Sequence, residues 1–496
     1  MATRKATPRR KARKATAGMT VRHYCQGIGD CHLLHFTKDD GSDFYMLIDC
    51  GLHSSVTNNT TKIKEIAADI AGVTKNIDVL VATHEHWDHI SGFRTANETF
   101  KTIRFGEAWL GWTEDPKDKQ ARKLDNYKTK ALKALDAVNS HLAPAKALSP
   151  YMQGVKEGIS SLRGFYFGAK GDTVRNARNA TVALAKKVKY IEPSSKPLTI
   201  PGMKNLRIYV LGPPRDEAMI RVTDRASEMY GLSMNRGHAM SAALLNAVAN
   251  FTTATAPPDD DVIDPFDRNL GEPLSSLLAA GSSSQRGDAD SDPRFVDLRR
   301  FVAAHYGDAA TKGEQDWRRI DFDWTGVGAD LAMQLDDRTN NTSVVLAFEF
   351  VDTGRVFLFA ADAQIGSWLS WQDLRWKVDG EWVTAQDLLK RTVFYKVGHH
   401  GSQNATARAK GLELMDSPDL DAFIPTNQKD ALKVNWGAMP YKILLKDLEE
   451  RCRGRVVRAD DAWIGTGKVP ASLSSGKGSI TAAACGKGLW VEFELS

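Results

Sequence analysis

Short apolar runs separated by glycine and polar residues predict that the chain begins with several strands. Between residues 21 and 49 these runs are rich in Val, Leu, Ile and Phe, which is typical of strands. Next, Ile63, Ile66 and Ile70 recur at the spacing of one helix face, and the apolar run 77–82 predicts a buried strand. This order indicates the first half of a layered α+β domain. The opening strands are expected at residues 21–26, 31–37 and 44–49.

A different pattern follows between residues 101 and 200. Apolar positions there recur at helical spacing, and a second helical stretch is expected near residues 181–188. We therefore expect a mostly helical insertion that lies over the rim of the domain. Strand signals return at 206–211, and an Ala- and Leu-rich helix is expected near 239–249. The positions that predict the first inserted helix are Leu124, Tyr127, Ala131, Leu135 and Val138.

The last third of the chain returns to short apolar runs, so we expect it to complete the domain. Pro440 is placed to open a helix whose inward positions are Ile443, Leu444 and Leu448. The strands before this helix are expected at residues 344–351, 355–359, 393–397 and 422–424.

Composition separates these segments from two others. The first 18 residues hold Ala, Thr, Pro and basic side chains without apolar periodicity, so we expect disorder. The segment 255–295 is rich in Pro, Asp, Ser and Gly and carries nine acids against three bases, which predicts a flexible linker. The chain thus divides into a basic tail (1–18), the first half of the domain (19–100), a helical basic insertion (101–200), a returning strand and helix (201–254), an acidic linker (255–295) and the second half of the domain (296–496).

Three histidines and an aspartate follow the buried strand 77–82 directly. Imidazoles at His84, His86 and His89 and the carboxylate of Asp88 are ligand types that zinc, manganese or iron take. Strand alternation points positions 84 and 86 the same way, while 88 and 89 reach round the turn, which suits two adjacent metal ions. Histidine occupies only 12 of 496 positions, so a chance set of surface histidines is the less favoured interpretation.

The spacing His84-x-His86-x-Asp88-His89 resembles the signature of the metallo-β-lactamase fold hydrolases. The resemblance implies an αββα sandwich with a dinuclear metal site on one edge. The His-His-Gly-Ser sequence at 399–402 is most similar to the branch that holds the nuclease-like domain of competence ComEC proteins and choline-phosphate esterases. Further resemblances follow in order at residues 27–34, 47–51, 341–346, 358–362 and 396–402.

The resemblance also implies roles for individual residues. Asp362 would bridge both metals, and a histidine after the next strand would complete the second. Two histidines fit that place, and strand alternation favours His399 as the ligand, which leaves His400 as a proton donor. We therefore expect Asp88 and His400 to be catalytic, with Asp88 also a ligand. The expected metal ligands are His84, His86, Asp88, His89, Asp362 and His399, and the expected supporting residues are Asp49, Asp30 and Asn341.

One ligand of the first metal has no motif in this chain. Many members of the family supply a further histidine from the middle of the chain. His141, His238 and His305 are candidates by position only. The alternative is that the first metal relies on His84, His86, Asp362 and solvent.

The charge distribution bears on the partner. The net charge is +5, yet residues 1–17 carry seven basic side chains and no acid, and residues 117–190 carry sixteen basic against five acidic side chains. Such clusters favour an anionic partner, because neutralised phosphates release counterions. A solvated helix face explains the inserted cluster equally well. The predicted partner is a phosphate-containing substrate that includes nucleic acid as a candidate, with the oligomeric state left open.

Cysteines and hydropathy bear on the compartment. Five cysteines without C-x-x-C spacing favour reduced thiols, and no run of eighteen apolar residues occurs. We expect a cytoplasmic protein that does not enter a membrane. The leading hypothesis is a phosphodiesterase or nuclease with two divalent ions, zinc or manganese. The alternatives are a hydrolase of a small ester, lactone, amide or thioester, and a non-catalytic binding protein on the same fold.

Overall fold

The structure is a computed structural model that describes residues 18–142, 150–166, 173–222, 225–230, 293–306, 326–434, 436–474 and 477–496. The predicted basic tail, the helix near 239–249 and most of the acidic linker lie outside these residues. The chain forms two compact units. The first holds Met1–Tyr127, Ser161–Met234 and Gln334–Ser496, and the second holds Lys128–Ser160 and Asn235–Met333.

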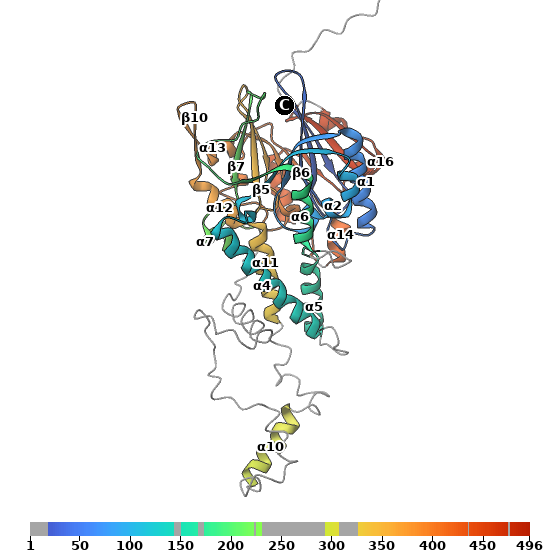
Figure 1. Cartoon of the computed structure of the whole chain (residues 1–496), viewed down its shortest axis with the longest axis vertical. Coiled ribbons are helices and arrows are strands. Elements are labelled where there is room, and N and C mark those ends of the chain that lie inside the picture. The colour runs from blue at the N-terminus through green and yellow to red at the C-terminus, as the bar shows by residue number, and fades with distance from the viewer. Residues whose placement is uncertain are drawn as a thin grey trace, which may run out of the picture. The chain divides into compact units, whose positions relative to one another are not determined.

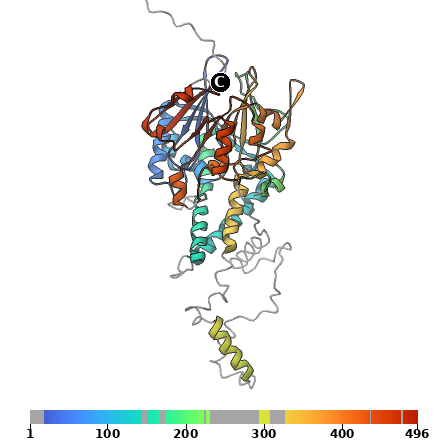
Figure 2. The same ribbon diagram turned by 180° about the vertical axis from the view of Figure 1, so that it is seen from behind.

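The first unit contains an eight-stranded sheet in which early strands of the sequence lie beside its last two strands (Figure 2). Its first strand pairs antiparallel with the C-terminal hairpin, and its second and third strands continue the antiparallel pairing. The last four strands run parallel. In sheet order the strands are β15 (Ile480–Cys485), β16 (Trp490–Leu495), β1 (Met19–Tyr24), β2 (Cys31–Thr37), β3 (Asp43–Cys50), β4 (Asn76–Ala82), β5 (Arg104–Gly111) and β6 (Ala185–Ile191).

A six-stranded sheet faces the first one. Its order is β14 (Val456–Arg458), β13 (Asp421–Ile424), β12 (Thr392–Lys396), β9 (Arg355–Phe359), β8 (Val345–Phe350) and β7 (Leu206–Gly212). A separate hairpin joins β10 (Arg375–Val378) and β11 (Glu381–Thr384).

Helices flank these sheets; in Figure 1, α1 and α2 lie on one side and α12 and α13 on the other. The helices of the first unit are α1 (Asn59–Val73), α2 (Trp87–Thr95), α3 (Asn97–Phe100), α6 (Val174–Leu184), α7 (Glu217–Arg221), α12 (Ile365–Ser370), α13 (Ala385–Lys390), α14 (Gln428–Lys433), α15 (Lys442–Arg451) and α16 (Ala462–Thr466). Three others, α4 (Lys119–Leu142), α5 (Pro150–Arg163) and α11 (Gly326–Asn340), have residues in both units, and α10 (Pro293–Tyr306) belongs to the second.

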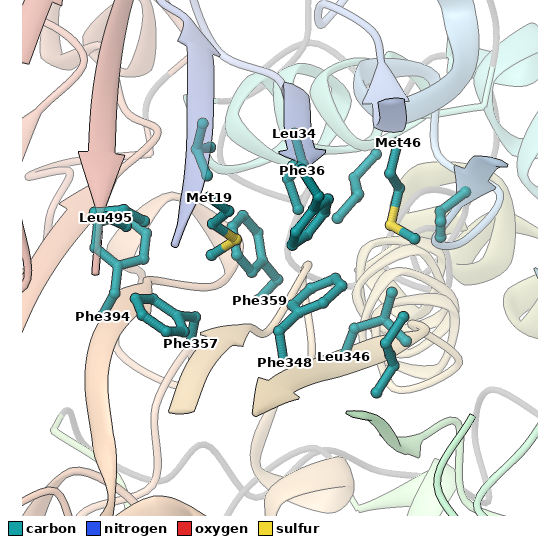
Figure 3. Packing of buried hydrophobic residues seen from close by; sticks show 14 of the residues in the cluster. Met19, Leu34, Phe36, Met46, Leu346, Phe348, Phe357, Phe359, Phe394 and Leu495 are labelled. Atoms are coloured by element: carbon teal, nitrogen blue, oxygen red, sulfur yellow. The ribbon is translucent and has the colours of Figure 1, made fainter. Parts of the chain in front are cut away.

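Alternating side chains of the two sheets form the central core (Figure 3). Phe36 of the first sheet packs against Phe348 of the second with ring centroids 5.9 Å apart, and Phe348 contacts Phe359 at 5.6 Å. Full burial of one such ring contributes about 1.5–3 kcal/mol. Outside the sheets, α1 buries its isoleucines and α15 buries Leu444 and Leu448. The expected mixture of helices and sheets is confirmed, with a helical layer on each outer side.

Two local expectations are wrong. The stretch expected to be helical near 181–188 ends as a helix at Leu184, because the following residues pair with β5 as the edge strand β6. Ile443, expected to face inward, is 50% exposed, since α15 lies on the sheet through the neighbouring face that carries Leu444. The described residues of the segment 101–200 form the α-helices α4, α5 and α6, yet they also supply β5 and β6 to the main sheet.

The second unit has a small core of its own where three helices meet. Val138 of α4 and Ile159 of α5 are fully buried. A Cβ at Gly328 of α11 would lie 3.1 Å from Val138, so the absence of a side chain there allows close packing. Among the helices of the described segments, none has both the length and the apolar character that a bilayer crossing requires.

Candidate metal centre

The candidate site lies where three strands end. The chain leaves β4 at Ala82 and enters the loop that carries His84 and His86, and α2 begins directly after His86. Asp362 follows β9, and His399 and His400 follow β12 in a single 3₁₀ turn. The carboxyl ends of these strands therefore bring together side chains from both halves of the sequence.

Two glycines let the β4–α2 loop approach the opening strands. A Cβ at Gly51 would lie 2.4 Å from the carbonyl carbon of Asp88, and a Cβ at Gly29 would lie 2.8 Å from the Asp88 carbonyl oxygen. The backbone N–H of Asp30 donates to that same oxygen at 3.0 Å. A side chain at either glycine would push the metal loop outward.

The proton positions of His84 and His86 follow from their outer neighbours. The Thr83 hydroxyl donates to Asp49 at 2.6 Å, so its oxygen accepts from Nδ1–H of His84 at 3.0 Å. On the other ring, Nε2 of His86 lies 3.0 Å from the Tyr166 hydroxyl. The inner atoms, His84 Nε2 and His86 Nδ1, lie 3.1 Å apart.

This pair fits a metal ion better than it fits a hydrogen bond. With protons on the two outer nitrogens, both inner nitrogens present lone pairs to each other. Two nitrogens on one tetrahedral zinc, each about 2.0–2.1 Å from it, lie about 3.3 Å apart. The observed separation is close to that value, so a cation between them would relieve the repulsion.

A second group brings together Asp88, His89, Asp362 and His400, all buried. Nε2 of His89 lies 3.1 Å from Asp362 Oδ2, and Nε2 of His400 lies 3.1 Å from Asp88 Oδ2 and 3.8 Å from Asp362 Oδ2. The outer nitrogens are fixed, because Nδ1–H of His89 donates to Asp49 at 2.8 Å and Nδ1–H of His400 donates to the Pro425 carbonyl at 2.7 Å.

The electrostatics differ between the two groups. Burial, followed by the nearby His89, lowers the pKa of His84 to about 3, so its inner nitrogen stays unprotonated. Burial also lowers the pKa of His400, but Asp362 and Asp88 outweigh burial and raise it above its usual value. Burial also lowers the pKa of His89, but Asp362, Asp88 and Asp49 outweigh burial and raise that pKa well above its usual value. The second group thus attracts positive charge, whether a proton or a metal ion.

The residues present fit divalent metal ions. Nitrogen and carboxylate ligands are the donor set of zinc and manganese sites, and each of the four imidazoles directs one nitrogen inward while a neighbour holds the other. In addition, the buried Oδ1 of Asp88 has no hydrogen-bond partner within the described structure. A carboxylate oxygen buried in this way is costly unless a cation or a donor meets it.

Lys396 links the two loops beneath the cluster. Its buried ammonium pairs with Asp30 and donates to the carbonyl of Ala361 at 3.2 Å. Asp30 underlies the loop that carries Asp88, and Ala361 directly precedes Asp362. The buried ammonium of Lys396 therefore links the two loops of the site, although Lys396 is not one of the clustered side chains.

The adjacent histidines occupy different surroundings. His400 is buried within the second group, whereas His399 is half-buried beside it. Nδ1 of His399 lies 2.7 Å from the Ser402 hydroxyl, and Nε2 lies 3.4 Å from the amide nitrogen of Asn340. Both histidines have left-handed backbone, with φ of 42° and 53°, a conformation that costs about 1–3 kcal/mol per residue and concentrates at functional sites.

Two expected supporting residues differ in position. Asp49 fixes both Thr83 and His89, and so orients the metal loop. Asn341 lies away from the histidines and joins α7 to α12, since its side chain donates to Val222 and accepts from Ser367. Its neighbour Asn340 reaches the site instead.

Sequence reasoning missed the supports from α11 and from Tyr166 in the turn that follows α5. Asp336, Thr339 and Asn340 recur at helical spacing on the last turns of α11, and all are buried. Asp336 Oδ1 lies 3.7 Å from His86 Nε2, and Thr339 contacts Tyr166 at 3.0 Å. The polar residues at helical spacing could have predicted that this face of α11 is buried at the site. No local sequence pattern predicts the role of Tyr166.

Three histidines were candidates for an additional ligand of the first metal, and their role stays a prediction. The side chain of His141 and all of His238 lie outside the described residues. His305 lies on α10 in the second unit, where its ring contacts Phe301 at 4.4 Å.

Comparison with known families identifies part of the chain. Residues 27–108 match the family model of the metallo-β-lactamase superfamily. The match includes the motif from His84 to His89 and ends before Asp362, His399 and His400. No curated protein matches the chain. Members of that superfamily are generally hydrolytic and bind divalent metals, in agreement with the buried His and Asp groups.

Proposed function

We propose that this protein is a hydrolase that uses two divalent cations, zinc or manganese, to cleave phosphodiesters, nucleic acids included. Two neighbouring groups of side chains carry the proposal. The first presents the inner nitrogens of His84 and His86, and the second is the buried group of two carboxylates and two histidines. Together they supply ligands for two adjacent ions. The cations, when bound, provide an activated water as nucleophile and neutralise negative charge in the transition state.

The ligand sets follow from which atoms point inward. The first metal would take His84 Nε2 and His86 Nδ1, and the second would take Asp88, His89 Nε2 and His400 Nε2. Asp362 belongs to the second group, and the resemblance implies that it would also serve the first metal. Burial raises the pKa of the Asp362 carboxyl, but His89 and His400 outweigh burial and hold that pKa well below its usual value. Asp362 is therefore ionised.

His399 takes the role of the proton-transferring residue in this assignment. Nδ1 of His399 lies 2.7 Å from the Ser402 hydroxyl and 3.2 Å from the side-chain amide nitrogen of Gln364. Two neighbours therefore hold Nδ1, and Nε2 is the nitrogen of His399 that would exchange a proton with a substrate. This assignment reverses the one expected from strand alternation, because the left-handed turn redirects both side chains.

Support for a phosphodiester comes from charge and from resemblance. Lys186, Lys187 and Lys189 are exposed along the edge strand β6, within the segment 117–190 that has sixteen basic against five acidic side chains. Edge lysines also discourage pairing with another strand. The His-His-Gly-Ser resemblance to the ComEC and choline-phosphate esterase branch favours the phosphodiester.

A second candidate is hydrolysis of a small ester, lactone, amide or thioester. It is favoured by the aromatic rings near the first group. Phe165 lies 5.0 Å from the His86 ring and stacks on Trp436 at 5.2 Å with an interplanar angle of 8°. Such a wall suits an apolar acyl group as well as a nucleobase. A non-catalytic protein is disfavoured because every expected ligand position but one is filled.

A cytoplasmic location is part of the proposal. Each of the five cysteines is free of disulfide bonds, and Cys25, Cys31, Cys50 and Cys452 are buried. Free thiols suit a reducing compartment.

The test combines metal analysis with activity. The purified protein should contain about two equivalents of zinc or manganese and should cleave bis-p-nitrophenyl phosphate together with DNA or RNA. Asp362→Ala should abolish turnover and lower the metal content. Asp416→Ala, which alters an exposed carboxylate, should change neither.

Two outcomes would contradict the proposal in different ways. Cleavage of p-nitrophenyl acetate without cleavage of any phosphodiester would favour the second candidate. Absence of bound metal, with activity unaffected by chelators, would reject a metal-dependent hydrolase of either kind.

A further inference from the structure

A chain of hydrogen bonds leads outward from His86 and has a defined direction. The Thr339 hydroxyl donates to the carbonyl of Leu335, one turn earlier in α11, at 2.8 Å. Its oxygen therefore accepts from the Tyr166 hydroxyl at 3.0 Å. The Tyr166 oxygen in turn accepts from Nε2–H of His86 at 3.0 Å. The backbone of α11 thus determines which nitrogen of His86 carries the proton.

From this geometry we infer that Tyr166 is a positioning residue that sets the tautomer of His86 and so creates the first metal's second nitrogen ligand. The inference rests on the proposed function, because it assumes a metal between His84 and His86. With the proton on Nε2, Nδ1 of His86 presents its lone pair toward Nε2 of His84. With the proton on Nδ1, that N–H would point into the position of the metal.

Tyr166 is well seated for this role. Its ring is 1% exposed and meets the His86 ring edge-on at 5.0 Å. Backbone hydrogen bonds fix the segment, since Trp87 N–H donates to Phe165 at 2.7 Å and Val174 N–H donates to Tyr166 at 3.0 Å. The buried hydroxyl contacts His86 and Thr339, so we expect its effect on the metal to pass through His86.

Asp336 does not replace the hydroxyl in this arrangement. Its Oδ1 lies 3.7 Å from His86 Nε2, beyond hydrogen-bond distance. Asp336 instead accepts from the amide of Asn340 at 3.1 Å, which keeps it turned along α11. Loss of the phenol oxygen would leave His86 Nε2–H without its hydrogen-bond acceptor.

The experiment measures metal affinity in the full chain by competition with a chromophoric zinc chelator. Tyr166→Phe keeps the ring and removes only the hydroxyl. Outer partners of histidine ligands typically account for about tenfold to a hundredfold in metal affinity. We expect that loss at one of the two sites, with the other unchanged, and an altered absorption spectrum of the cobalt-substituted protein.

A matched control is Tyr209→Phe, which removes a buried hydroxyl that donates to Glu349 at 2.6 Å, away from the histidines. It should bind two zinc ions with wild-type affinity. Thr339→Val removes the acceptor that orients Tyr166, and should weaken the same single site to a smaller extent.

The outcomes separate this inference from the proposed function. If the wild type binds no divalent metal, the proposed function fails. If the wild type binds two and Tyr166→Phe binds both as tightly, or loses both equally, only the inference about Tyr166 is overturned. Should Tyr166→Phe fail to fold, Thr339→Val decides, and unchanged affinity there rejects the inference.

Discussion

At the scale of single residues, the site is defined by where imidazole protons lie. Each clustered histidine has an outer nitrogen that donates to a fixed acceptor: Thr83 for His84, Asp49 for His89 and a backbone carbonyl for His400. A neutral imidazole has one donor and one acceptor nitrogen, so fixing the donor also fixes the ligand atom. The outer neighbours thus prepare the inner nitrogens for metal.

The adjacent histidines give the first residue-scale prediction. His400→Ala should lose about one of two bound metals, because it removes an inward nitrogen from the second group. His399→Ala should keep both metals and slow turnover by about 10²–10⁴, the usual contribution of a proton-transferring residue. Metal content by plasma mass spectrometry and turnover of bis-p-nitrophenyl phosphate check the pair. Metal loss in His399→Ala with normal content in His400→Ala would reinstate the assignment expected from the sequence.

At the scale of elements, the ends of strands and helices place the ligands and hold them still. Arg178 of α6 binds Glu85, the residue between the first two histidines, at 2.8 Å. Beneath the loops, Lys396 at the end of β12 holds Asp30 and the residue before Asp362. Four non-glycine residues at these ends have left-handed backbone, namely Asp49, Ala361, His399 and His400. Such conformations persist only where the surrounding contacts determine them.

Lys396 gives the prediction at this scale. Lys396→Met should lower the free energy of unfolding by about 3–5 kcal/mol, because Asp30 would remain as a buried charge without its partner. Urea denaturation followed by circular dichroism measures the change. Lys390→Met, on the exposed side of α13, should stay within about 0.5 kcal/mol of wild type.

A double variant tests the cause. Lys396→Met combined with Asp30→Asn should recover part of the lost stability, since the unpaired charge is then absent. Equal stability of the single and double variants would show that the loss arises from packing rather than from the charge.

At the scale of the first unit, a metal bound at the proposed centre would stabilise the fold. The cluster joins loops of the eight-stranded sheet to loops of the six-stranded sheet, with two carboxylates, Asp88 and Asp362, buried among histidines. Metal that binds only the folded chain adds stability by mass action, about 2.7 kcal/mol at a hundred times its dissociation constant.

Metal removal is the prediction at this scale. Dialysis against a chelator should lower the midpoint of thermal unfolding, and added zinc or manganese should restore it. The His86→Ala variant should show a smaller shift because its first site is impaired. An identical midpoint with and without chelator in the wild type would contradict a preformed metal centre.

The sequence by itself determined most of the local elements and the first cluster of candidate ligands. Strands such as β2 and β9 have the bounds that their apolar runs predicted, because alternation reflects burial between two layers. The motif from His84 to His89 needed no tertiary information, since four candidate ligands within six positions share one turn.

Only the tertiary structure decided how distant residues complete the site. Tyr166 meets His86 across 80 positions, and Lys396 meets Asp30 across 366. The proposed choice between His399 and His400 also rests on the folded chain, because two consecutive left-handed residues break the alternation that a strand would impose. Spacing along the chain constrains neighbours within a turn, whereas the direction of a side chain after a loop depends on the contacts that the loop makes.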